Sequence, residues 1–377
     1  MSVIDPFVAR VGQLFQASGD HLIWARLGDG QVWNVVSGRH EPGDQSGRLI
    51  EPEQAYFTVR LAEMFLGRSR TLWRKFYPVV HAFCSYADAQ QHAVAGPGQL
   101  QSVTDAGLDR VVTLNFRLAG PTPFRGGDVS VVTGLYSVPG DDAAKALVET
   151  VSAIAGLAVL QASAAAAQVA QITQVIKNGI DSIFQLNTTK LRLGVNDTMS
   201  GAQPLRAGYY VAIAASATDV DFGRLWLVDG HLLEGRDPIA GRPFVGHDYL
   251  VIQLERSDRL PNWPALPGMT EQQQRFNTVL GDDLNSAAEK SERLNKLWPG
   301  FNEALQTSPY LTKADATAIA NDVLADLTGR LNAQRSGNPF ESKSWGSDDL
   351  EATSATEIDF AEVPESGRTS APAPAPF

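Results

Sequence analysis

The sequence predicts an α+β protein: a central β-rich, sandwich-like domain with a long Ala-rich helical insertion, followed by a C-terminal helical hairpin and a disordered tail. Three observations predict this class. Runs with a period of two residues concentrate between residues 108 and 258. Apolar residues recur at helical spacing within 142–186 and 269–335, and residues 336–377 are acidic, Pro/Ala-rich and without periodicity. Residues 1–107 then form a mixed α/β N-terminal region.

A predicted hairpin over residues 22–36 opens the N-terminal region, because Gly-Asp-Gly at positions 28–30 supplies turn residues between two β-rich runs. Pro52 marks the expected start of a helix. The apolar residues at helical spacing in this helix are Phe57, Leu61, Met64 and Phe65. A second helical piece is expected to end near Pro78, and residues 93–107 are expected to form a loop.

The central region is predicted to be mainly β. From Arg110 to Leu118 the chain alternates between two sets of side chains, as in a half-buried strand. Further strand candidates are residues 129–138, 190–195, 208–216, 224–229 and 248–255. Together these strands predict a sandwich or a curved sheet.

An apolar stripe runs through the Ala-rich insertion at about 142–186, and no charge occurs from Thr150 to Ile176. Alanine at four-residue steps lets the backbone of a partner helix approach closely. The predicted assembly surface consists of Ala158, Ala162, Ala166 and Ala170. Gly156 or Gly179 could interrupt the segment, so one helix and a helical hairpin both remain open.

Three interpretations of this stripe remain open: packing inside its own domain, self-association, and insertion into a membrane. The length of the segment would allow a membrane span. Its polar side chains argue against one, because lipid could not satisfy their hydrogen bonds. These side chains are Gln161, Ser163, Gln168, Gln171 and Gln174.

The C-terminal helical hairpin is predicted over residues 269–335. Thr270 and the residues after it resemble a capping box, and apolar positions continue at helical spacing to Leu297. Pro299 is expected to end this helix, and Thr312 to begin the next one. The buried face of the second helix is predicted to hold Ile319, Val323, Leu327 and Leu331. The two helices are expected to pack antiparallel.

Charge and cysteine content narrow the classes of partner. The formal net charge is −11, and residues 338–377 contribute −6 of it through eight acidic and two basic side chains. Because an acidic chain attracts phosphate backbones poorly, nucleic acid is not an expected partner. Cys84 is the only cysteine, which excludes an intramolecular disulfide. With no pattern of a secretory signal at the N-terminus, we expect a cytoplasmic protein, or one bound peripherally at a membrane.

Acidic and imidazole side chains gather between residues 219 and 248. Asp219 and Asp221, together with Asp197, suit a hard cation such as Ca²⁺, which takes several oxygen ligands. This metal site is an architectural analogy with C2-type lipid-binding modules, and solvated turn residues are the alternative. His231 or His247 could supply acid–base chemistry, but proximity along the chain does not establish geometry. No catalytic residue and no cofactor other than Ca²⁺ is therefore predicted.

A second candidate site is cationic. It consists of Arg68, Arg70, Arg74 and Lys75. These side chains surround Leu72 and Trp73 and could bind phosphate groups or the acidic tail. The alternative is an amphipathic helix with solvated arginines. His81 and Cys84 could form a thiolate pair if they lie one helical turn apart, but a buried, inert cysteine is the simpler interpretation.

The phosphate-loop, zinc-protease, nucleophile-elbow and dinucleotide fingerprints are absent from the sequence. We therefore expect a non-catalytic binding or assembly protein, a scaffold or adaptor that uses the Ala-rich surface and the acidic tail for a protein partner or for self-association. One alternative is a peripheral lipid- or membrane-binding protein with a C2-like sandwich. The other is a hydrolase-type enzyme centred on residues 219–248.

Overall fold

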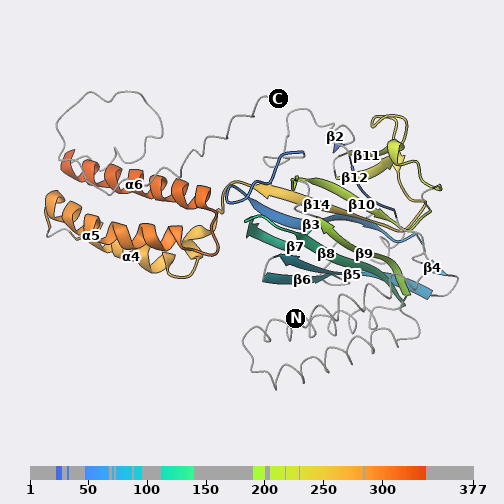
Figure 1. The fold of residues 1–377 in the computed structure, drawn as a ribbon, viewed down its shortest axis with the longest axis horizontal. Helices are drawn as coiled ribbons and strands as arrows, with labels where there is room; N and C mark the ends of the chain where they lie inside the picture. The colour runs from blue at the N-terminus through green and yellow to red at the C-terminus, as the bar shows by residue number, and fades with distance from the viewer. Residues whose placement is uncertain are drawn as a thin grey trace, which may run out of the picture. The chain divides into compact units, whose positions relative to one another are not determined.

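The chain divides into two compact units, Met1–Ser257 and Asp258–Phe377. The computed structural model describes residues 23–27, 32–33, 47–67, 70–71, 74–86, 89–95, 112–139, 190–199 and 204–336, except 217, 229, 283 and 284. Within these residues the first unit is built from β-strands and the second from α-helices (Figure 1). The predicted α+β class is confirmed. The Ala-rich insertion and the tail beyond Ser336 lie outside the described residues.

The middle layer of the first unit is an antiparallel sheet, the central sheet, with the strand order β1-β10-β14-β3-β7. The strands are β1 (Ile23–Arg26), β10 (Gly208–Ile213), β14 (Tyr249–Ser257), β3 (Tyr56–Phe65) and β7 (Val112–Pro123). Apolar clusters cover both faces of this sheet. For that reason nine of the ten residues of β3 are buried.

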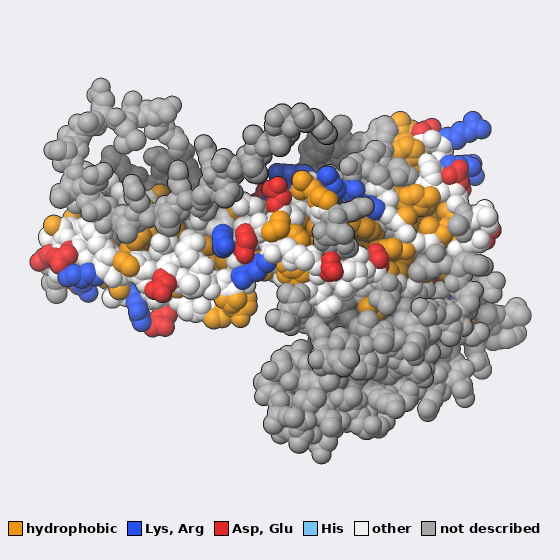
Figure 2. Space-filling model, in the orientation of Figure 1, with side chains coloured by type: hydrophobic (Ala, Val, Ile, Leu, Met, Phe, Trp, Pro, Cys, Tyr) orange, Lys and Arg blue, Asp and Glu red, His pale blue; other side chains and the backbone are white. Residues whose placement is uncertain are grey.

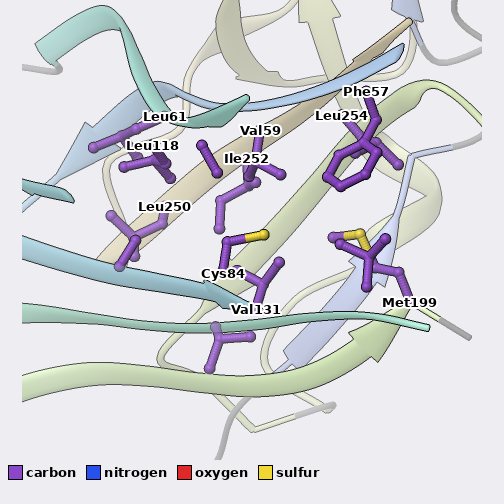
Figure 3. Close-up of a cluster of buried hydrophobic side chains, with 14 of the residues drawn as sticks. Phe57, Val59, Leu61, Cys84, Leu118, Val131, Met199, Leu250, Ile252 and Leu254 are labelled. Atoms are coloured by element: carbon purple, nitrogen blue, oxygen red, sulfur yellow. The ribbon is translucent and has the colours of Figure 1, made fainter. Parts of the chain in front are cut away.

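A second sheet, the insertion sheet, covers one face of the central sheet. Its strands are β4 (Arg70–Thr71), β5 (Arg74–Tyr86), β8 (Val129–Pro139) and β9 (Lys190–Met199), with β6 (Ala89–Ala95) paired to β5. The shared core brings Cys84 and Val131 of the insertion sheet together with Leu250 and Ile252 of the central sheet (Figure 3). This packing is the sandwich that the sequence predicts.

A third and smaller layer, the small sheet, covers the opposite face of the central sheet. Its strands, in order, are β13 (Arg242–Pro243), β12 (His231–Glu234), β11 (Leu225–Val228) and β2 (Val32–Trp33). A short 3₁₀ helix, η2 (Phe222–Arg224), precedes β11. Leu227 and Leu232 of the small sheet pack in one cluster with Phe65, Val211 and Tyr249 of the central sheet. The first unit is therefore a three-layered β-structure.

Side-chain hydrogen bonds join the central and insertion sheets near both of their edges. On one side, Gln91 of β6 accepts a hydrogen bond from the backbone N–H of Gly120 and donates one to Thr122, both in β7. On the other side, the indole N–H of Trp24 in β1 donates to the Asp197 carboxylate in β9. These bonds fix the edges of the sandwich.

The helix predicted from Pro52 is wrong, because residues 56–65 form strand β3 in the middle of the central sheet. Apolar side chains occupy both faces of β3, since one face meets the insertion sheet and the other meets the small sheet. A strand buried on both faces loses the alternation that identifies half-buried strands. Its apolar residues then match helical spacing by chance.

Other local predictions also need correction. The second helical piece is wrong, because Pro78 lies inside β5. The loop predicted from residue 93 begins inside β6. The predicted 22–36 hairpin contains two strands, but β1 pairs with β10 and β2 pairs with β11, in two different sheets. The strand candidates from 129 to 255 correspond to β8, β9, β10, β11 and β14.

Strands from both sides of residue 107 share the same sheets. β3 pairs with β7 and β14, and β5 pairs with β8. A boundary at residue 107 therefore does not separate two β-structures, whereas the boundary after Ser257 does separate the two units.

The second unit contains α4 (Met269–Leu280), α5 (Ala287–Gln306) and α6 (Lys313–Ser336), preceded by the 3₁₀ helix η3 (Trp263–Ala265). Lys290, at the start of α5, donates hydrogen bonds to the Leu280 carbonyl at the end of α4 and to Gln334 near the end of α6. The start of α5 thus lies beside the end of α6, which confirms the antiparallel packing of these two helices. Thr312 caps α6 by accepting from the Asp315 N–H, as predicted.

The first predicted helix of the hairpin is in fact two helices. A capping box at Ser286 and Glu289 begins α5, and α4 ends before Gly281. Pro299 does not end a helix but lies inside α5. Trp298 and Phe301, on either side of it, are buried, and this burial offsets the cost of an interior proline, about 3 kcal/mol.

Candidate functional site

The most unusual buried side chain in the first unit is Glu63, a carboxylate in the middle of β3 with no exposed surface. Its Oε2 atom accepts a hydrogen bond from the backbone N–H of Leu232 at 2.6 Å. Its Oε1 atom lies 3.0 Å from Nδ1 of His231. Both partners belong to β12, so this carboxylate of the central sheet bonds directly to the small sheet.

Burial raises the pKa of Glu63 above its ordinary value of 4.5, although the hydrogen bonds from Leu232 and His231 act in the opposite direction. Tyr249 of β14 also interacts with this carboxylate. Burial first, and then the negative charge of Glu63, raise the pKa of the Tyr249 hydroxyl. The carboxylate therefore lies in a place that favours its neutral form.

The His231 side chain is 52% exposed, while its Nδ1 atom faces the buried carboxylate. A carboxylate at Nδ1 orients an imidazole and fixes which nitrogen carries the proton. The pair therefore joins a fully buried carboxylate to a ring that is half exposed to solvent. The Glu63–His231 pair is the candidate site of the first unit.

Three other acidic or imidazole residues between 219 and 248 have partners outside this pair. Asp248 accepts hydrogen bonds from Gly67 N–H and pairs with Arg192 of β9 at 2.7 Å. Asp237 accepts from two backbone N–H groups of its own turn. The His247 ring stacks on Phe244. Each of these residues has a local structural partner, so the hydrolase hypothesis for residues 219–248 gains no shared site from them.

The predicted metal site does not form among the described residues, which hold no group of three or more His, Cys, Asp or Glu arranged for an ion. Asp197 lies at the sandwich edge and binds Trp24. Asp221 caps η2 by accepting from Gly223 N–H at 3.1 Å, and Asp219 is an exposed turn residue. The alternative interpretation, solvated turn residues, fits the exposed Asp219 and Asp221.

The described residues of the predicted cationic cluster, Arg70, Arg74 and Lys75, lie on a strand pair and not on a helix. Arg70 is opposite Lys75, and Thr71 is opposite Arg74, in the β4–β5 pairing. Lys75 is exposed. Arg68 lies outside the described residues, as do Ala158, Ala162, Ala166 and Ala170 of the predicted assembly surface.

His81 and Cys84 do not form a reactive pair. They lie three positions apart on β5, and the helical geometry needed to bring them together is absent. Cys84 packs in the core between the two large sheets (Figure 3), and burial raises its pKa to about 12. Burial also lowers the pKa of His81 to about 3, and its ring contacts Tyr136. The interpretation of Cys84 as a buried, inert side chain is supported.

Comparison with protein-family models finds no match, and comparison with curated proteins finds no significant match. Among the described residues, no helix has the length and apolar character needed to cross a membrane. The candidate site is therefore identified from its geometry alone.

Sequence reasoning missed Glu63. The helix expected from Pro52 was based on the apolar residues Phe57, Leu61, Met64 and Phe65 and assigned no role to Glu63. The available signal was a single acid flanked by Leu61, Ala62, Met64 and Phe65. On a strand buried on both sides, such a residue must find hydrogen-bond donors in the adjacent layer.

Proposed function

We propose that this protein is a non-catalytic assembly protein, in which a β-sandwich carries residues 140–189 as a self-association element. The observation that carries the proposal is the pairing of β8 with β9. Ser137 lies opposite Lys190, so the strands are direct neighbours at the point where the chain leaves the sheet and returns. Neighbouring antiparallel strands need a connection of only about 2–5 residues.

The segment is therefore far longer than its structural task requires. Its sequence combines an uncharged stretch with alanines at four-residue steps, a pattern used for close helix packing. The sandwich that carries it has hydrogen bonds at both edges and a continuous core. A rigid carrier with a long small-residue insertion is suited to holding copies of the chain together.

Light scattering coupled to size exclusion tests this proposal. We expect the full chain to be an oligomer, and the double variant Ala162→Glu, Ala166→Glu to be monomeric with unchanged far-UV circular dichroism. The matched control is Gln274→Glu, Thr278→Glu, which adds two charges at the same spacing to exposed positions of α4. A monomeric wild-type protein, or an equal loss of mass in the control, would contradict the proposal.

A peripheral lipid-binding function is a second candidate, favoured by two exposed apolar side chains. Ile239 is 77% exposed in the β12–β13 connection, and Val245 is 54% exposed in the segment that leads to β14. Exposed Arg236 and Arg242 lie three positions before Ile239 and Val245, respectively. Figure 2 shows hydrophobic and basic side chains close together in the region where Figure 1 places β11 and β12. Apolar and basic groups together suit an anionic membrane surface.

Flotation with vesicles that contain phosphatidylserine, with and without calcium, tests this second function. Binding to these vesicles should fall severalfold in the double variant Ile239→Asp, Val245→Asp. The control variant Thr218→Asp should bind the same vesicles as well as the wild-type protein does. No flotation of the wild-type protein under either condition would exclude this function.

A further inference from the structure

We propose that Glu63 makes the attachment of the small sheet to the central sheet proton-dependent, so that β11 and β12 hold most tightly at acid pH and loosen as the pH rises. Glu63 is fully buried on β3, and both of its oxygen atoms are used by β12. The apolar contacts of Leu225, Leu227 and Leu232 surround this polar contact. A change of charge at Glu63 therefore acts at the interface of two layers.

The ionisable groups facing Glu63 come from two elements. His231 lies on β12, with its ring 52% exposed, and Tyr249 lies on β14. The neighbouring Asp248 is directed to Gly67 and Arg192. Arg60, on the same strand as Glu63, pairs with Glu255 at 2.6 Å. Among the described residues, His231 is thus the ring that contacts Glu63 directly, while Arg60 and Arg192 are paired with other carboxylates.

The direction of the effect follows from linkage. Burial raises the pKa of Glu63 in the folded protein above the ordinary value of 4.5. A carboxyl group with a raised native pKa contributes stability that is fully present below its unfolded value and is lost as the pH rises through the native value. The neutral acid still accepts the Leu232 N–H bond, whereas the ionised form bears the cost of desolvation.

Hydrogen exchange of the Leu232 amide, corrected for its intrinsic rate, measures the attachment directly. We expect its protection to fall roughly threefold or more between pH 5 and pH 8 in the wild-type protein, because loosening of the small sheet releases the proton of Glu63. In Glu63→Gln the protection should stay nearly constant over the same range. The control is Glu234→Gln, which removes an exposed carboxyl group from β12, the strand of Leu232. This variant should show the same pH dependence as the wild-type protein.

Carbon NMR titration of the glutamate carboxyl groups in the wild-type protein gives a second readout that needs no variant. The Glu63 resonance should titrate above the ordinary glutamate range. A Glu63 resonance that titrates at or below 4.5, or a Leu232 protection that changes equally in Glu63→Gln, would overturn the proposal.

Discussion

Replacing Phe301 with alanine is expected to destabilise the helical unit by about 3–5 kcal/mol, the cost of removing a large aromatic side chain from a packed core. Phe301 has no exposed surface. Its ring meets the Phe276 ring edge-on, with the ring centroids 5.2 Å apart. The ring centroids of Trp298 and Trp263 lie 5.7 and 6.3 Å away. Truncation to alanine therefore leaves a cavity among α4, α5 and η3 in their shared core.

Differential scanning calorimetry checks this prediction. Because Met1–Ser257 and Asp258–Phe377 are separate compact units, only the transition of the helical unit should move. Tyr310→Ala is the control, since its side chain is half exposed and its loss should cost less than about 0.5 kcal/mol. A Phe301→Ala variant in which both transitions shift together would show that the units do not unfold independently.

Asp248→Ala is expected to destabilise the β-unit by about 2–3 kcal/mol, because the side chain makes charge-assisted hydrogen bonds and is only 5% exposed. Its carboxylate joins three strands: it lies just before β14, accepts from Gly67 just after β3, and pairs with Arg192 in β9. Removing it leaves a partly buried arginine without this carboxylate.

Urea unfolding of the β-unit provides the measurement. Asp248→Asn should lose less than the alanine variant, because its amide oxygen can still accept from Gly67 N–H. Glu255→Gln, which breaks the partly exposed pair with Arg60, should cost below about 1 kcal/mol. An Asp248→Ala variant as stable as Glu255→Gln would mean that the link between β9 and β14 carries little energy.

The sequence predicted the strands and helices that carry a clear local signal. β7, β8, β10 and β14 alternate or are bounded by turn residues, and the start of α6 has its cap. β3 was missed because its side chains are apolar on both faces and its apolar residues also match helical spacing. Likewise, Pro299 was taken as a helix end because local propensity does not include the burial of Trp298 and Phe301.

The candidate site was less predictable than the fold. His231 was singled out within residues 219–248, but Glu63 lies 168 positions away in sequence. Only the pairing of β3 with β14, and the packing of β12 on both, brings the two residues together. The acidic residues also suggested a metal site. Asp197 and Asp221 instead accept hydrogen bonds from Trp24 and from the Gly223 N–H, at separate places in the fold.

The central claim, self-association through residues 140–189, is tested most directly by cross-linking between copies of the chain. Because Cys84 is the only cysteine and is buried, the variant Cys84→Ala, Ala162→Cys places a single reactive thiol on the proposed surface. Close packing of small residues predicts rapid formation of a disulfide-linked dimer under mild oxidation, whereas Cys84→Ala, Gln274→Cys should stay monomeric. Equal cross-linking of the two variants, or none in either, would contradict the claim.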